Sequence, residues 1–145
     1  SKAVPEKLIA DPIVEKAIRH PLLGIDKRTG GLTEADLEEV TSLFLASSKI
    51  TDAGLKEVTK LQQLTSLVLS NTQITDAGLK ELAKMQKLRG LALNSTEIND
   101  TGLKEVAKLQ QLKSLNLNSN KITKTCVAEL QKALPKCDIR SNPTK

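Results

Sequence analysis

Between Val40 and Pro135 the apolar positions of the chain recur every 24 residues, four times in succession and without insertions. The four units cover residues 40–63, 64–87, 88–111 and 112–135. Units of this length cannot bury their own apolar face and must stack on one another, so the period predicts a solenoid.

The second unit shows how one repeat is built. Its first part has the pattern LxxLxL, in which small or polar residues alternate with leucine, and this alternation predicts a short strand with one buried face. Ile74 is expected to point inward at the following turn. The second part predicts a helix over residues 77–87, capped by Thr75 or Asp76. The apolar stripe of that helix is Leu79, Leu82, Ala83 and Met85.

Four units of strand, turn and helix predict an α/β fold, in which the strands form one parallel sheet and the helices stack on its other side. A helix is wider than the spacing of about 4.8 Å between strands. The stack is therefore expected to curve, with the sheet on the concave face and the helices on the convex face.

Two columns of small or polar residues recur at fixed places in the units. Glycine stands near the helix start at Gly54, Gly78 and Gly102. Because glycine in a helix costs about 1 kcal/mol relative to alanine, we expect that packing requires a small residue there. The fourth unit has Cys126 at this place, and its thiol is expected to be buried in the same slot. The column expected to bond the backbone of the turns is Ser48, Thr72, Thr96 and Asn120.

The phrase TDAGLKE occurs at residues 51–57 and again at 75–81. With this phrase and the LxxLxL pattern, the chain resembles the leucine-rich repeat family, in particular short bacterial repeats akin to the ribonuclease-inhibitor-like and cysteine-containing classes. It departs from the cysteine-containing class because serine, threonine or asparagine stands where that class has cysteine. The resemblance covers residues 40–142 and implies a protein that recognises macromolecules, usually proteins, on the concave face.

The two ends of the chain do not follow the repeat and are expected to cover it. Residues 1–39 predict a helical N-terminal cap, with one helix opening at Asp11 and Pro12 and a second capped by Thr33. The apolar side of the first helix is expected to be Ile13, Ala17 and Ile18. The second helix is expected to be held by the pairs Thr33–Asp36 and Leu32–Leu37. Residues 136–145 predict a last edge strand and a tail, which would make the chain a complete small solenoid or a complete domain.

Composition and charge limit the classes of partner. The chain has 145 residues with one phenylalanine, no tryptophan and no tyrosine, and its formal net charge is +5. Residues 112–145 carry seven basic and two acidic side chains, so the excess lies at the C-terminal end. Such a patch can attract acidic ligands, but nucleic-acid binding is not expected without aromatic residues for base stacking. No apolar run is long enough for a membrane span, and no export signal is visible, which predicts a soluble protein of unknown compartment.

Few residues could carry chemistry. His20 is the only histidine and has no spaced partner, and no metal-binding spacing, phosphate-binding loop or nucleophile motif occurs. We therefore expect no enzymatic activity, no metal and no cofactor. Cys126 and Cys137 are predicted to stay thiols, since a helix of about nine residues spans roughly 13 Å and a disulfide needs Cα atoms within about 7 Å. Lysines and glutamates alternate along the helices and are interpreted as a solvated face.

The outward positions of the predicted strands vary most between the units. The column between the two strand leucines reads Phe44, Val68, Ala92, Asn116 and Arg140. We expect an apolar anchor at Phe44 and Val68, with a polar rim at the other end of the face. The alternative left open is that Leu22, Leu23 and Ile25 of the N-terminal loop cover Phe44. The candidate partner-binding residues are Ser42, Phe44, Ala46, Ser66, Val68, Ser70, Ala92, Asn94, Ser114, Asn116, Asn118, Asp138 and Arg140.

These observations predict a protein–protein interaction module that binds a protein or peptide through its concave face, as a monomer or a weak homo-oligomer. Two alternatives remain, a purely structural or tethering domain of a larger assembly and a binder of acidic ligands at the basic C-terminal end. Five strands offer roughly a few hundred Å² of outward surface, below the roughly 800 Å² per partner of a standard interface. A protein partner would therefore also use the rim and caps, bind weakly, or present a tail or peptide.

Overall fold

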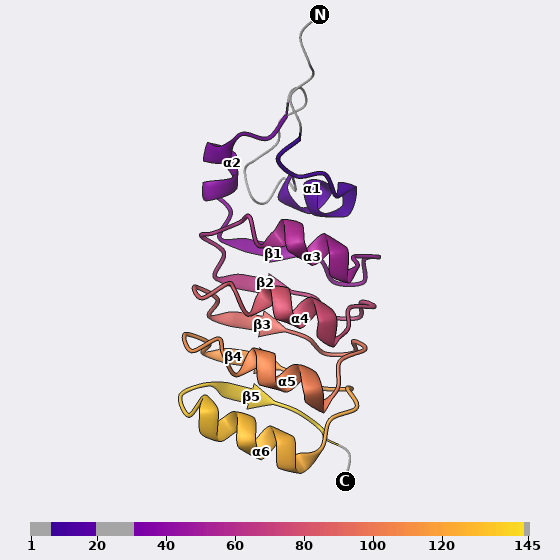
Figure 1. Cartoon of the computed structure of the whole chain (residues 1–145), viewed down its shortest axis with the longest axis vertical. Helices are drawn as coiled ribbons and strands as arrows, with labels where there is room; N and C mark the ends of the chain where they lie inside the picture. The colour runs from indigo at the N-terminus through magenta and orange to yellow at the C-terminus, as the bar shows by residue number, and fades with distance from the viewer. Residues whose placement is uncertain (1–6, 20–30, 144–145) are drawn as a thin grey trace, which may run out of the picture.

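In the computed structural model of the chain, which describes residues 7–19 and 31–143, five short strands follow one another in a single parallel sheet (Figure 1). The strands are β1 (Ser42–Phe44), β2 (Ser66–Val68), β3 (Gly90–Ala92), β4 (Ser114–Asn116) and β5 (Asp138–Arg140). Each residue pairs with the residue 24 positions later, as Leu67 does with Leu91. The order of strands in the sheet equals their order in the chain, which confirms the predicted solenoid.

The helices are α1 (Pro12–Ile18), α2 (Glu34–Glu38), α3 (Asp52–Val58), α4 (Asp76–Leu82), α5 (Asp100–Val106) and α6 (Lys124–Ala133). Helices α3 to α6 form a second layer that stacks beside the strands, and α1 and α2 lie at the N-terminal end of the stack (Figure 1). The predicted end of the second repeat's helix at residue 87 is wrong, because α4 ends at Leu82. Beyond it the backbone N–H groups of Lys84 and Met85 donate to carbonyl oxygens three residues earlier, which tightens the chain into turns that lead to β3. None of the helices in the described ranges is long and apolar enough to cross a bilayer.

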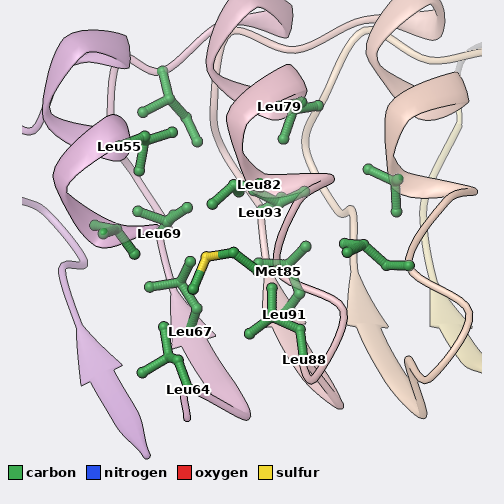
Figure 2. Packing of buried hydrophobic residues seen from close by; sticks show 14 of the residues in the cluster. Leu55, Leu64, Leu67, Leu69, Leu79, Leu82, Met85, Leu88, Leu91 and Leu93 are labelled. Atoms are coloured by element: carbon green, nitrogen blue, oxygen red, sulfur yellow. The ribbon is translucent and has the colours of Figure 1, made fainter. Parts of the chain in front are cut away.

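The core lies between the two layers and continues through the whole stack. Figure 2 shows the leucines of neighbouring repeats filling the space between helix and sheet. The strand leucine Leu67 is fully buried, as is Ile74 at the turn, and Leu79 and Leu82 of α4 are each 1% exposed. The apolar positions that recur in the sequence are therefore the positions that pack between the layers.

The turn after each strand is held by the predicted polar column. In each of the first three repeats a hydroxyl group donates to the carbonyl oxygen three residues earlier, as Thr72 does to Leu69 over 2.8 Å. Asn120 fills this place in the fourth repeat, and its amide nitrogen donates to the carbonyl oxygens of Leu93 and Leu117 at 2.8 and 3.1 Å. Asn120 therefore joins two successive turns, and the expected role of this column is confirmed.

Each glycine of the column lies against an aspartate at the start of the preceding helix of the stack. A Cβ added at Gly78 would overlap Asp52 Oδ1 and lie 2.7 Å from Leu55 Cδ1. Asp52 is held in place because it accepts hydrogen bonds from the backbone N–H and the hydroxyl of Thr75, at 2.9 and 2.6 Å. At Gly78 and Gly102 this aspartate leaves no room for a side chain. In the last repeat Cys126 takes the same place beside Asp100, although Asp100 accepts hydrogen bonds from Thr123 in the same way.

The last member of this column departs from the expectation of a buried thiol. Cys126 is only half-buried. It shares its slot with Asp100, and α6, to which it belongs, is the last helix of the described ranges, so no further helix covers the outer side of α6 there. Cys137 is the buried cysteine, at 5% exposure. Both are free thiols, as predicted. Burial and, to a smaller extent, neighbouring Asp138 raise the pKa of Cys137.

The first helix begins where the sequence predicts. The Asp11 carboxylate accepts hydrogen bonds from the backbone N–H groups of Ile13 and Val14, at 2.8 and 3.2 Å, and caps α1. The buried side of this helix is Val14 and Ile18, whereas the predicted core positions Ile13 and Ala17 are only partly buried at its margin. The apolar side of α1 is thus rotated by part of a turn from the predicted one.

The second helix begins with a complete capping box. Thr33 Oγ1 accepts from the Asp36 N–H at 3.2 Å, and Asp36 Oδ2 accepts from the Thr33 N–H at 2.8 Å. Leu37 is buried and Leu32 partly buried against the core. The residues of the sequence analysis that lie outside the described ranges are His20, Leu22, Leu23 and Ile25.

Polar contacts dock the N-terminal segment on α3. The Ala10 N–H donates to Glu57 Oε1 at 2.7 Å, and Lys60 Nζ donates to the Leu8 carbonyl oxygen at 2.7 Å while pairing with Glu57. The equivalent pairs of α4 and α5 are ion pairs of 2.9 and 2.8 Å with exposed lysines, as expected for a solvated face. The first repeat therefore uses this column for a second purpose, which is to hold the cap.

Candidate functional site

The outward side chains of the five strands form one surface, which we call the sheet face. In β2 the middle residue Leu67 is fully buried, while Ser66 and Val68 on either side of it are partly exposed. The same alternation holds in β1, β3 and β4. The parallel register then aligns equivalent residues of neighbouring strands. The middle row of the sheet face is Phe44, Val68, Ala92, Asn116 and Arg140.

Two further rows flank the middle row. One row runs along the first residues of the strands and is Ser42, Ser66, Gly90, Ser114 and Asp138. The other lies just beyond the strand ends and is Ala46, Ser70, Asn94, Asn118 and Asn142. All candidate partner-binding residues of the sequence analysis therefore lie on the sheet face, in adjacent rows.

One end of the sheet face is apolar. Phe44 is 69% exposed and is the only large apolar side chain exposed among the residues that the structure describes. It pairs in register with Val68, which in turn pairs with Ala92, and both of these are partly exposed. The loop residues that were the alternative cover for Phe44 lie outside the described ranges.

The middle of the sheet face presents hydrogen-bond donors. Ser70 Oγ donates to Asn94 Oδ1 at 2.6 Å, and the backbone N–H of Asn118 donates to Asn116 Oδ1 at 3.0 Å. Both amide oxygens are thereby occupied within the protein. No described residue accepts a hydrogen bond from the NH₂ group of Asn94 or Asn116, so these groups are left to donate to a ligand.

The opposite end of the sheet face carries its charges. Asp138 and Arg140 lie in different rows of β5 and both are exposed. Neither forms an ion pair with any residue of the described ranges. Arg140 pairs in register with Asn116, so the side chains of these two donor residues leave the sheet from adjacent positions. Together the three rows can offer apolar contact at one end and positively charged or neutral donors at the other.

Two cavities lie away from the sheet face, at the edge where helices lead into strands. One of about 430 Å³ lies between the turns at residues 59–64 and 84–87. The other, of about 360 Å³, lies between Leu8, Lys60 and α2. Sequence reasoning did not indicate either cavity, because the lining residues come from separate turns and share no motif. Within the described ranges, no group of three histidine, cysteine, aspartate or glutamate side chains could hold a metal ion.

Comparison with known proteins identifies the repeats by family. Residues 60–83 and 84–107 each match a family model described as a leucine-rich repeat, and residues 111–133 match a second model of that description. None of the curated proteins matches the chain. A leucine-rich repeat protein of Leptospira interrogans is 31% identical, with a TM-score of 0.57, over 74% of this chain. The chain spans only 27% of the length of that protein.

Two solved structures from Listeria monocytogenes are also similar. Internalin C2 is 17% identical with a TM-score of 0.44, and the match covers 100% of this chain and 93% of that protein. Internalin F is 17% identical with a TM-score of 0.43, and the match covers 98% of this chain and 61% of that protein. The family-model matches fall within the repeats that the 24-residue period defines.

Proposed function

Because the chain is a leucine-rich repeat protein, we propose that it is a non-enzymatic binding module that recognises a protein or peptide through the sheet face. The observation that carries this proposal is the position of Phe44. The chain has a single aromatic residue, and this residue lies outside the core with 69% of its surface exposed. Aromatic side chains dominate the binding energy of protein interfaces when a partner covers them.

The surroundings of Phe44 support an interface rather than an isolated exposed side chain. Single apolar residues on a surface are common and have no functional meaning by themselves. Here, however, Phe44 continues into Val68 and Ala92 along the middle row, and polar donors follow at Asn116. An apolar region that adjoins polar groups free to bond a ligand is an arrangement found at binding surfaces.

The size of the sheet face limits the kind of complex that it can form. Four strand spacings of about 4.8 Å make it roughly 19 Å long, and four residues of about 3.3 Å make it roughly 13 Å wide. The resulting area of roughly 250 Å² is well below the roughly 800 Å² per partner of a standard interface. The sheet face alone is thus suited to a short segment, whereas a folded partner must also contact the edges of the solenoid.

Affinity capture with matched variants tests the proposal. The sheet-face variant combines Phe44→Glu and Arg140→Glu, and the control variant combines Ala77→Glu and Lys80→Glu on the exposed side of α4. Both change the net charge equally, and circular dichroism establishes that both fold. Proteins from native cell extract that bind wild type and the control variant but not the sheet-face variant support the proposal. Capture of the same proteins by all three contradicts it.

A further inference from the structure

The sheet face is apolar at one end and carries hydrogen-bond donors and a positive charge at the other, and this difference indicates the class of ligand. The inference that follows rests on the proposed function. We propose that the ligand is a short, extended acidic peptide segment that crosses the strands. Its bulky apolar side chain lies against Phe44 and Val68, and its carboxylate lies against Asn116 and Arg140.

The donors of the sheet face require acceptors on the ligand. Since the amide oxygens of Asn94 and Asn116 already accept hydrogen bonds from Ser70 and Asn118, their NH₂ groups are the parts that remain available. An NH₂ group can only donate. Peptide carbonyl oxygens and carboxylates are the matching groups, and a hydrogen bond to a charged acceptor is stronger than one to a neutral acceptor.

The charges place the acidic group at one corner of the sheet face. Arg140 is exposed, has no ion-pair partner in the described part of the chain, and lies beside Asn116 in the middle row. Asp138 lies in the row that starts with Ser42 and repels a carboxylate that approaches from that side. The acidic group is therefore directed to Arg140 and the row of Asn118. The surrounding C-terminal end, with seven basic and two acidic side chains in residues 112–145, attracts such a group from a distance.

The length of the middle row fixes the spacing within the ligand. The apolar contact is centred between Phe44 and Val68, and the acidic contact between Asn116 and Arg140. These two centres are three strand spacings apart, or about 14 Å. An extended peptide advances about 3.3 Å per residue, so its acidic residue follows or precedes the apolar one by about four positions. The width of the sheet face accommodates one such chain.

Selection from a displayed library of random heptapeptides tests this ligand class. Three immobilised proteins are compared, namely wild type, Arg140→Glu, and Lys56→Glu as a charge-reversal control on the exposed side of α3. With wild type and Lys56→Glu, we expect enrichment of peptides with a bulky apolar residue and an aspartate or glutamate about four positions apart. With Arg140→Glu, the preference at the charged position should change to lysine or arginine.

Anisotropy titrations of one enriched peptide, labelled with fluorescein, measure the same contacts. Arg140→Glu should weaken its binding about fivefold or more at low salt, whereas Lys56→Glu should leave it unchanged. The difference should shrink as salt is added, because exposed charges are screened. Replacing the acidic residue of the peptide by its amide should weaken binding to wild type, but by less than Arg140→Glu does, because it removes the attraction without adding a repulsion.

The outcomes separate this inference from the proposed function. Enriched peptides that share a bulky apolar residue but show no acidic preference overturn the acidic ligand and leave the binding function standing. Enrichment that Arg140→Glu does not alter overturns it in the same way. If no heptapeptide is enriched, a short-segment ligand is excluded, and the capture experiment alone decides whether the sheet face binds a folded partner. Loss of sheet-face dependence in that experiment overturns the proposed function itself.

Discussion

Replacement of Gly78 by alanine tests the packing of the solenoid most sharply, because two physical effects predict opposite signs. In an exposed helix, alanine is more favourable than glycine by about 1 kcal/mol. At Gly78, however, the new Cβ would overlap Asp52 Oδ1 and lie 2.7 Å from Leu55 Cδ1, and both atoms belong to the preceding repeat. The expected sign of the change thus depends on the contact between repeats.

The magnitude follows from what must move. Overpacking a well-filled site costs about 1–3 kcal/mol. Relief of the overlap would displace Asp52 from the two hydrogen bonds that it accepts from Thr75, each worth about 1 kcal/mol. Set against the gain in helix propensity, we expect Gly78→Ala to lower the free energy of unfolding by about 2 kcal/mol.

Urea denaturation followed by circular dichroism measures this difference, since the chain has no tryptophan or tyrosine for fluorescence. Gly90→Ala is the matched control, because its Cβ would meet nothing closer than Ser66 Oγ at 3.8 Å. We expect the unfolding midpoint of the control to be unchanged or slightly higher. In an Asp52→Ala background, Gly78→Ala should cost less than it does in wild type. A Gly78→Ala variant as stable as wild type, or more stable, would refute the reasoning.

Three further predictions concern single side chains. Asn120→Ala should lower the free energy of unfolding by about 2–3 kcal/mol, measured by urea denaturation, because it leaves the Leu117 carbonyl oxygen and the Thr96 N–H without their partner. Burial opposes ionisation of Glu57, but hydrogen bonds from Lys60 and the Ala10 N–H outweigh it and hold its pKa below the ordinary 4.5. The stability that ionised Glu57 contributes is therefore present above pH 4.5 and lost as the pH falls through the lowered pKa. Glu57→Gln should be less stable than wild type at neutral pH, and the difference in stability should shrink in acid. Urea titrations at several pH values measure this difference. Iodoacetamide should modify half-buried Cys126 before Cys137, because Cys137 is buried and its thiol has a raised pKa. Peptide mass spectrometry measures the two rates, and equal rates would contradict the burial of Cys137 beside β5.

The repeating part of the fold was predictable because each position of the repeat occurs four times along the chain, and its apolar or polar character recurs. The alternation around Leu67 predicts a buried leucine with outward neighbours, and the register of the sheet confirms it. The end of α4 was not predictable from the same pattern. Residues such as Met85 lie in turns with bonds three residues back, so they keep a helix-like spacing and point into the core although the helix has ended.

Contacts between repeats and at the ends of the chain were harder to predict. The small side chain needed at Gly78 was expected, but its partner Asp52 belongs to another repeat and became apparent only in three dimensions. Glu57 resembles its equivalents in later repeats, yet it holds a segment that occurs once in the chain. On the sheet face, alternation predicted which residues point outward. The direction of each amide did not follow from sequence, because it depends on neighbours such as Ser70.

The most direct test of a binding role for the sheet face is photo-crosslinking from the position of Phe44. Benzoylphenylalanine replaces Phe44 in one sample and Lys80 of α4 in a matched control, and both are irradiated in native cell extract. The proposed function predicts a crosslinked partner from position 44 that excess wild-type protein competes away, and no such product from position 80. Identical products from both positions, or none from position 44, would contradict it.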